Sequence, residues 1–247
     1  MSHNIVIIGG GAGGIATAAS LLKRDASLNI SIIEPQNEHY YQPGWTMVGG
    51  GIFSQAETAR SMQSLIPSGA TWLQASVSSF QPEQNQVTLD NGDTINYDIL
   101  VVSPGLQLDW GKVAGLEETL GKNGVTSNYR YDLAPYTWEL VQNLKAGTAL
   151  FTQPPMPIKC AGAPQKAMYL SGSHWAKTGV LNDINISFYN AGPGLFGVAD
   201  YIPALMEYVK KYRASLEFSH NLIAVDGDKK IATFAGKDAD GNDVTVE

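Results

Sequence analysis

The sequence predicts an α/β protein with parallel sheets in two domains and an inserted β-hairpin layer in the first. Three observations favour this class. Apolar strand-like segments alternate with helix-like segments, a glycine turn joins the first strand to the first helix, and an Asp-Asn-Gly-Asp turn separates two short strands within residues 86–97. We expect a first domain over residues 1–110, which binds a dinucleotide, and a second α/β domain over residues 111–247, which carries the cysteine.

The first strand and the turn after it are the most informative part of the chain. Residues 5–8 are Ile-Val-Ile-Ile, and the glycines that follow have G-x-G-x-x-G spacing. Gly9 permits a tight turn, Gly11 lets a pyrophosphate approach the backbone, and Gly14 lets helix and strand pack closely. The remaining turn residues are Ala12 and Gly13, whose amides belong to the positive end of the helix.

A second signal strengthens this interpretation. The strand over residues 29–33 ends in Glu34, at the distance from Gly14 where an acid holds a ribose hydroxyl. The structural alternative is a glycine turn that binds nothing. The two signals together predict a site for an adenine dinucleotide.

Composition narrows the class of protein. The chain has 247 residues, of which 44% are hydrophobic and 16% are charged, as in globular proteins. A net charge of -7 argues against nucleic-acid partners. We find no apolar run of the roughly twenty residues that a membrane span needs, and no room for a signal peptide before the first strand. These features predict a cytoplasmic protein.

The rest of the first half contains both irregular and regular segments. The aromatic stretch over residues 35–51 is predicted as a loop, either along a planar ligand or packed on the core. A helix is expected over residues 54–65, with Ser54 and Glu57 as a capping box. Residues 71–80 have strand composition.

A buried strand over residues 98–103 ends this half of the chain. It stops at the turn formed by Ser103, Pro104 and Gly105. The order of glycine loop, ribose acid, hairpin and this turn resembles the two-dinucleotide-fold flavoprotein superfamily, the FAD/NAD(P)-binding fold. The resemblance implies that the first glycine loop binds FAD and that Ser103, Pro104 and Gly105 lie near it.

The second half contains the chain's only cysteine, so an intramolecular disulfide is excluded. A helix is expected over residues 132–144 and a strand over residues 148–152. Prolines at three positions in the turn after that strand disfavour a nicotinamide nucleotide there. Cys160 then precedes a helix over residues 165–177, and Lys159 beside it favours the nucleophilic thiolate. A small buried thiol is the equally weighted alternative from spacing alone.

A closer resemblance decides between them. Residues 157–166, Pro-Ile-Lys-Cys-Ala-Gly-Ala-Pro-Gln-Lys, closely resemble the cysteine segment of sulfide:quinone oxidoreductases, in the branch that includes the mitochondrial enzyme. Residues 34–44, with Pro35 and Gln42, resemble the same family's ribose-binding segment, which adds these two residues to the FAD site. In that family two cysteines flank the flavin, sulfide attacks a sulfur bridge between them, and a persulfide forms. Cys160 matches one of the two.

The resemblance also implies partners. Electrons from sulfide pass through FAD to a quinone, and a small molecule accepts the sulfur. Family members are longer, and their C-terminal part carries the second cysteine and helices that bind a membrane surface. We therefore expect a truncated chain, whose full-length protein is peripheral to the inner membrane. The sequence leaves a homo-oligomer open.

Two other functions are weighed against this one. Glycines at 192, 194 and 197 repeat the G-x-G-x-x-G spacing after a strand over residues 184–189, with Glu217 at the ribose distance, and would suit an NADH-dependent flavoprotein reductase. The third hypothesis is a non-catalytic sulfur-binding or scaffold protein. A helix is expected over residues 200–213. His174 is predicted as a surface or half-buried helix residue rather than a proton carrier, and the histidines show no metal-ligand spacing.

The C-terminal segment is predicted as β-structure. Residues 223–234 read as a hairpin rather than as the Gly-Asp signature that Gly227 and Asp228 mimic. Residues 243–247 read as a strand cut short.

Overall fold

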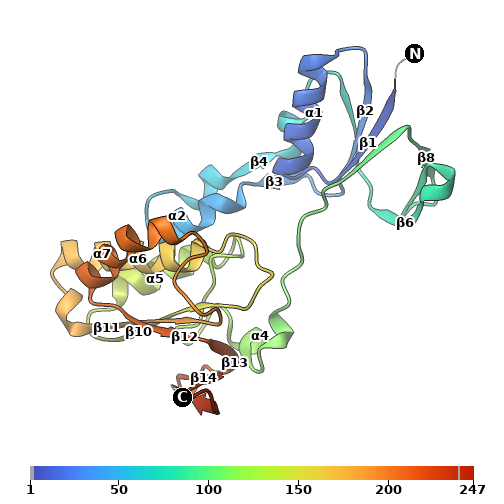
Figure 1. The fold of residues 1–247 in the computed structure, drawn as a ribbon. Coiled ribbons are helices and arrows are strands. Elements are labelled where there is room, and N and C mark those ends of the chain that lie inside the picture. Colours follow the sequence, from blue (N-terminus) through green and yellow to red (C-terminus); the bar gives the residue numbers. More distant parts are fainter. Residues whose placement is uncertain (1–2, 239) are drawn as a thin grey trace. The chain divides into compact units, whose positions relative to one another are not determined.

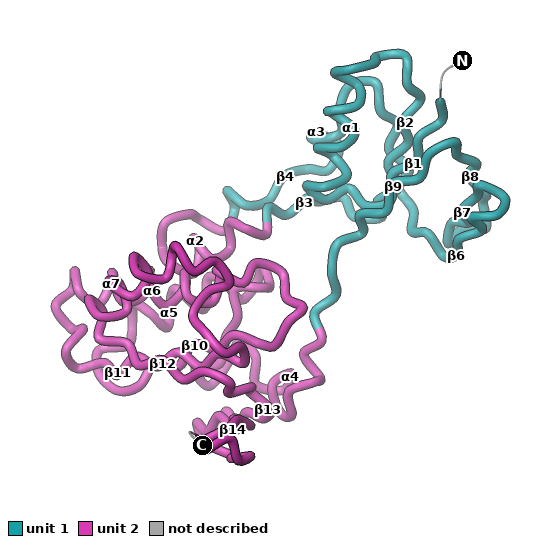
Figure 2. Tube along the Cα trace, viewed as in Figure 1, with its two compact units in different colours: residues 1–41, 56–108 teal, residues 42–55, 109–247 magenta. Residues whose placement is uncertain are grey.

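The computed structural model describes residues 3–238 and 240–247. These residues form two compact units, coloured separately in Figure 2. Unit 1 contains the residues up to Tyr41 together with Ala56–Leu108, and unit 2 contains Gln42–Gln55 together with Asp109–Glu247. The sequence predicts one boundary near residue 110, with residues 42–55 in the first domain. The structure assigns these residues to unit 2 instead.

A four-stranded parallel sheet forms the centre of unit 1 (Figure 1). The helix α1 (Ala12–Arg24) connects its first two strands. Alternate side chains of β1 (Asn4–Ile8) point to opposite faces, so that Ile5 and Ile7 pack with Ala18 of α1 while Val6 and Ile8 pack on the other face. In sheet order, the strands are β5 (Ala70–Leu73), β2 (Asn29–Ile33), β1 (Asn4–Ile8) and β9 (Ile99–Val102).

The expected hairpin layer covers that second face. Val87 and Leu89 of its middle strand are buried against Val6 and Ile8. The predicted strand over residues 71–80 is broken in two, because the chain leaves the parallel sheet after Leu73 and enters this antiparallel one at Val77. The layer consists of β6 (Val77–Gln81), the short 3-10 turn η3 (Pro82–Gln84), β7 (Gln86–Leu89) and β8 (Thr94–Asn96).

The predicted helix over residues 54–65 is wrong. The backbone of residues 59–61 instead pairs with residues 38–40, an antiparallel ladder flanked by hydrogen bonds from Tyr41 to Thr58 and from Met62 to Asn37. The stretch 35–51 is also more regular than predicted. Its elements and those that follow are β3 (Glu38–Tyr40), η1 (Gln42–Gly44), α2 (Trp45–Gly49), η2 (Gln55–Thr58), β4 (Ala59–Ser61) and α3 (Met62–Leu65).

Unit 2 has its own parallel sheet, with helices packed on one face (Figure 1). The core under the helices includes Met168, Trp175 and Phe188, each at most 2% exposed. The strands are β10 (Gly147–Gln153), β11 (Ile184–Asn190) and β12 (Ser215–Phe218), in that order. The helices are α5 (Ala134–Asn143), α6 (Ala163–Thr178) and α7 (Ile202–Tyr212), close to the predicted segments.

An antiparallel sheet completes unit 2. Tyr189 of β11 stacks on Phe234 with ring centroids 4.0 Å apart. The predicted hairpin over residues 223–234 is confirmed, and Gly227 and Asp228 lie in its turn. The strands are β13 (His220–Asp226), β14 (Ile231–Lys237) and β15 (Asp243–Val246). Short elements of this unit are η4 (Trp110–Lys112), α4 (Leu116–Thr119), η5 (Leu181–Asp183) and η6 (Ala199–Tyr201).

Residues 42–55 join unit 2 through a small core. Trp45 and Val48 of α2 are buried with Ala134 of α5, and Tyr131 packs against them. Burial of a tryptophan removes a large apolar area from water, which explains why this segment packs with α5. Among the described residues, none of the helices is long and apolar enough to cross a membrane.

Candidate functional site

The glycine loop of unit 1 is built as the spacing predicts. Gly9 has φ +101°, and a Cβ there would lie 2.2 Å from the carbonyl oxygen of Ser103. A Cβ on Gly14 would lie 1.9 Å from the carbonyl oxygen of Gly9. These two glycines are therefore required by the packing of the loop against the end of β9 and against α1.

Gly11 is different. No other described atom lies within 4 Å of the position that its Cβ would take. The packing of the chain therefore does not require a glycine here, and the space above the loop suits the close approach of a phosphate group. Gly11 is also the N-cap of α1, and no described side chain caps that helix end or places an acid in its first turn. The amides of Ala12 and Gly13 thus belong to a helix end that favours an anion.

Glu34 contacts this loop directly. One carboxylate oxygen accepts a hydrogen bond from the Gly10 amide at 2.9 Å, and the other accepts one from the Gln36 amide at 2.9 Å. Pro35, between Glu34 and Gln36 in the sequence, has no backbone N–H and donates no hydrogen bond. The carboxylate therefore braces the turn, and each oxygen keeps a further lone pair that can accept from a ribose hydroxyl.

Two further contacts fix this end of the sheet, and sequence reasoning missed both. The indole of Trp72 donates to the Glu34 carbonyl at 2.8 Å, and a ring nitrogen of His39 lies 3.0 Å from the Gly10 carbonyl. A cluster of aromatic residues after the ribose acid is the only signal that could have found His39.

The turn after β9 also meets the loop. The Ser103 amide donates to the Ile8 carbonyl at 2.8 Å, and its hydroxyl donates to the same carbonyl at 3.0 Å. Gly105 has φ +83°, with no described atom within 4 Å of a Cβ position. The structure therefore brings Gly9–Gly14, Glu34 and the turn at Ser103 and Pro104 to one edge of the sheet in unit 1.

The second glycine pattern is not a phosphate loop in this fold. The Gly192 amide donates to the side-chain oxygen of Asn190 at 2.8 Å, and its carbonyl accepts from the Ser219 amide. Asn190, 1% exposed, also donates to the Gly194 carbonyl. The next helix begins only at Ile202, so that its first turn lies outside the glycine turn. A buried asparagine that braces a turn explains this segment.

Cys160 lies in the loop between β10 and α6. The thiol residue is exposed and has φ +63°, and its carbonyl accepts the Ala163 amide at 2.9 Å. Gly162 is the N-cap of α6, and Pro164 stands in the first turn as predicted. The structure thus excludes the alternative of a buried packing thiol.

A cavity of about 20 Å³ borders Cys160, with room for a group about the size of a water molecule. The buried side-chain oxygen of Asn128 has no hydrogen-bond partner among the described residues. The ionisable side chains that line the cavity are those of Tyr129, Lys159, Cys160 and Lys166, and the lining also includes Gln42 and Asn128.

Hydrogen bonds tie this lining together. The Tyr129 hydroxyl donates to the Lys159 carbonyl, and the Lys159 ammonium donates to the side-chain oxygen of Gln42. Gln42, expected at the FAD, therefore has its described partner beside Cys160. Lys159 is exposed overall, but partial burial of its ammonium lowers its pKa. The charge of Cys160 raises this pKa and that of Lys166 lowers it, and the net shift is downward. Burial raises the pKa of Tyr129 to about 12, with a contribution from Cys160.

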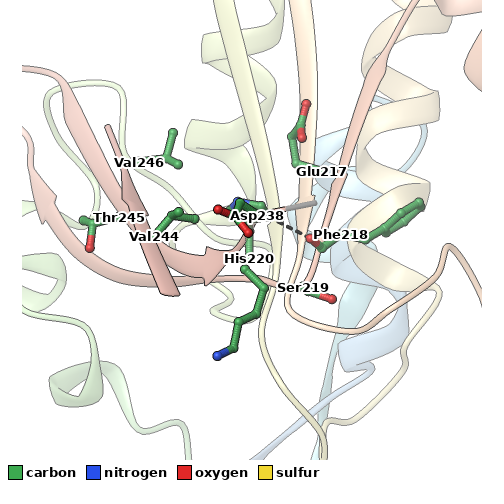
Figure 3. A pocket seen from close by; sticks show the side chains of 9 residues that line it. Glu217, Phe218, Ser219, His220, Asp238, Val244, Thr245 and Val246 are labelled. Atoms are coloured by element: carbon green, nitrogen blue, oxygen red, sulfur yellow. Dashed lines mark hydrogen bonds between the residues drawn. The ribbon is translucent and has the colours of Figure 1, made fainter. Parts of the chain in front are cut away.

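Two other features of unit 2 lack comparable chemistry. His174 packs edge-on against Trp138 with centroids 4.8 Å apart, and burial lowers its pKa, as suits a structural helix histidine. An open groove lies between β12 and β15, lined by side chains that include Glu217, His220 and Asp238 (Figure 3). The His220 ring in it is held by the Phe218 carbonyl at 2.7 Å. The described residues form no cluster that could hold a metal ion.

Known proteins are similar to this chain in sequence and in fold. Residues 3–137 match the pyridine nucleotide-disulphide oxidoreductase family. The chain is 46% identical over 232 residues to the mitochondrial sulfide:quinone oxidoreductase of Dictyostelium discoideum, covering 93% of this chain and 51% of that protein. It is 41% identical over 239 residues to the mitochondrial sulfide:quinone oxidoreductase of Mus musculus, covering 97% and 53%.

The fold has a similar counterpart among solved structures. The sulfide:quinone oxidoreductase of the hyperthermophilic bacterium Aquifex aeolicus superposes with a TM-score of 0.80 at 21% identity, over 99% of this chain and 56% of that one. The chain therefore spans about half the length of the relatives that it matches.

Proposed function

Because the chain belongs to the pyridine nucleotide-disulphide oxidoreductase family, we propose that it is the part of a flavoprotein that oxidises sulfide and passes electrons through FAD to a quinone. One observation carries the proposal. Cys160 is accessible, lies in a strained loop, and borders a cavity whose ionisable lining contains two lysines and no described carboxylate. Such a site suits a thiolate and a small anion such as hydrosulfide.

FAD is the cofactor of this family, and unit 1 fits it. Gly11, Ala12 and Gly13 would hold the pyrophosphate through backbone amides, with Gly9 and Gly14 shaping the turn. Glu34 would accept a ribose hydroxyl, and Pro35 continues that segment. Ser103, Pro104 and Gly105 would lie along the cofactor. When bound, FAD supplies the chemistry of accepting an electron pair and passing it on.

Cys160 would carry the sulfur. In the proposed step, hydrosulfide attacks the sulfur of Cys160 while this is bridged to a second thiol that lies outside this chain. The old sulfur–sulfur bond breaks, a new one forms on Cys160, and the electron pair leaves with the second thiolate. Lys159 and Lys166 would stabilise the negative sulfur, and the unpaired Asn128 oxygen would accept a hydrogen bond from an S–H group.

The quinone, the membrane surface and the small-molecule sulfur acceptor belong to the same proposal. The relatives from Dictyostelium discoideum and Mus musculus are both named as mitochondrial enzymes. We place the full-length protein at the surface of a quinone-containing membrane, which it would contact through a segment outside this chain. A cytoplasmic location for the chain itself stays a prediction.

Anaerobic titration of the FAD-loaded, full-length protein tests the proposed function. Sulfide is expected to bleach the visible flavin absorption on the time scale of enzyme turnover. Addition of a quinone is expected to restore that absorption. NADH, added separately, is expected to leave the flavin oxidised, because prolines 154, 155 and 157 remove amides from the turn after β10. Bleaching by NADH without bleaching by sulfide would identify a reductase instead.

A further inference from the structure

The backbone at Cys160 adopts a conformation that it does not prefer. Its φ of +63° is in the left-handed region, where the Cβ of an L-residue comes too close to the next carbonyl oxygen. A residue in this region keeps its conformation only when its surroundings determine it, and such residues gather at functional sites. The direction of the Cys160 side chain therefore depends on what holds residues 159 and 160 in place.

Within the described part of the chain, three hydrogen bonds act on Lys159 and Cys160. The Cys160 carbonyl accepts the Ala163 amide at 2.9 Å, which ties the loop to the start of α6. The Lys159 carbonyl accepts the hydroxyl of Tyr129, and the Lys159 ammonium donates to Gln42. The first bond is local, whereas the other two come from segments 30 and 117 residues away in the sequence.

We propose that Tyr129 is a positioning residue for Cys160. Its hydroxyl holds the carbonyl of Lys159, fixes the peptide that precedes the cysteine, and so keeps the thiol beside Lys159 and Lys166, which line the same cavity. Gln42 assists by holding the Lys159 side chain. The role deepens the proposed function and rests on it, since the sulfur chemistry of Cys160 is what requires a fixed thiol.

The protonation of Tyr129 is consistent with a permanent donor. Burial, with a smaller contribution from the charge of Cys160, raises the pKa of the phenol to about 12. The hydroxyl therefore keeps its proton at neutral pH, and the bond to the Lys159 carbonyl persists whichever protonation state the thiol adopts. Tyr129 and Cys160 both line the cavity.

Alkylation of the 247-residue chain tests the proposal, because Cys160 is its only thiol. We would measure by intact-mass spectrometry the rates with iodoacetate, which is an anion, and with iodoacetamide, which is neutral. Their ratio cancels differences in exposure and in thiolate fraction, and it reports the positive charge beside the sulfur. A general loss of structure would bring both rates to those of the urea-unfolded chain.

The expected result is specific to one oxygen atom. Tyr129→Phe should lower the ratio toward that of the urea-unfolded chain, because loss of an ordinary hydrogen bond reduces the preference for the held loop conformation about fivefold. Tyr136→Phe is the matched control, because the Tyr136 hydroxyl accepts the Gly124 amide at 3.1 Å and does not line the cavity. Lys166→Gln should lower the ratio directly by removing a charge. Gln42→Met, which frees the Lys159 side chain, serves as the second variant if Tyr129→Phe does not fold.

A wild-type ratio in folded Tyr129→Phe, beside a lowered ratio in Lys166→Gln, overturns the proposal. If Tyr129→Phe does not fold, a wild-type ratio of the two alkylation rates in Gln42→Met overturns the proposal. The measurement needs no flavin, sulfide or quinone. Failure of sulfide to reduce the full-length protein would therefore overturn the proposed function while leaving this alkylation result intact, and the two failures are distinguishable.

Discussion

At the scale of single residues, the glycines of the first loop have different tasks. Gly9 and Gly14 are required by the fold, because a Cβ at either position would overlap a backbone carbonyl. A Cβ on Gly11 would meet open space, so the fold does not require a glycine there. A glycine is needed at this position only for the close approach of a bound phosphate group. Substitution to alanine should therefore separate folding from cofactor binding.

We expect Gly14→Ala to lower the free energy of unfolding by about 1–3 kcal/mol, because helix and loop must move apart. Gly11→Ala should change it by less than about 1 kcal/mol, since its φ of -71° suits alanine. It should nevertheless weaken FAD binding by the full-length protein about tenfold or more, because the phosphate loses close approach to the amides. Urea unfolding and FAD titration measure the two effects. Equal FAD affinity in Gly11→Ala and wild type would contradict the assignment of the loop.

Tyr129 provides a prediction in pH. Its folded-state pKa of about 12 exceeds the ordinary 10.0, so the fold favours the neutral phenol. That stabilisation is complete below pH 10 and is lost as the pH rises toward 12. Wild type should therefore lose more unfolding free energy over this interval than Tyr129→Phe does. Urea unfolding at several pH values measures this loss of unfolding free energy. Identical losses in both proteins would contradict the raised pKa of Tyr129.

The sequence predicted the residues of the glycine loop but not the surroundings of Cys160. Glycine spacing encodes a local turn, and the acid at the end of the next strand follows from the register of a parallel pair. Tyr129 and Gln42 reach Lys159 from 30 and 117 residues away, and Asn128 lies next to Tyr129. No local pattern marks such residues, because tertiary packing alone brings them to the thiol.

At the scale of elements, the segment 42–55 shows how packing overrides local preference. Its helix α2 buries Trp45, which is 9% exposed, and Val48 against Ala134 of α5. Gly51, with φ +70°, lies against the ring of Trp138, where a Cβ would be 2.4 Å from the indole. These contacts are made within unit 2 and stabilise the start of α5.

Trp45→Ala should accordingly destabilise unit 2 by about 3–5 kcal/mol. Hydrogen exchange followed by mass spectrometry should show faster exchange in α5 and α2, with exchange in β1 and β2 of unit 1 unchanged. Trp72→Phe, which removes the indole donor to the Glu34 carbonyl in unit 1, is the complementary control. Faster exchange of β1 in Trp45→Ala would contradict the assignment of residues 42–55 to unit 2.

Elements with a strong period were predicted well, and the helix over residues 54–65 was not. Buried strands such as β1 and β11 carry continuous or alternating apolar residues, and α6 begins with proline in its first turn. Ser54 and Glu57 have capping-box spacing, but the backbone of residues 59–61 finds its partners in β3 instead. A capping signal describes one turn only, and a strand pairing across 18 or more residues can outweigh it.

At the scale of the whole molecule, the described strands form two parallel sheets and three antiparallel ones. The fold class was predicted from the alternation of strands and helices and from the glycine loop, whereas FAD was implied by the resemblance to the flavoprotein superfamily; the comparisons confirm both. The division into units was less accessible, because residues 42–55 lie between segments of unit 1 in the sequence. The chain also spans about half of each relative, so the proposed function concerns the full-length protein.

The most direct test of the account is the sulfur chemistry of Cys160 in that full-length protein. Cys160→Ser keeps the size of the side chain but cannot hold a sulfane sulfur, so FAD binding should persist while sulfide-dependent bleaching of the flavin is abolished. In wild type, peptide mass spectrometry after sulfide exposure should find an additional sulfur on Cys160. Flavin reduction by sulfide at the wild-type rate in Cys160→Ser would contradict the account and leave Cys160 without a role in the reaction.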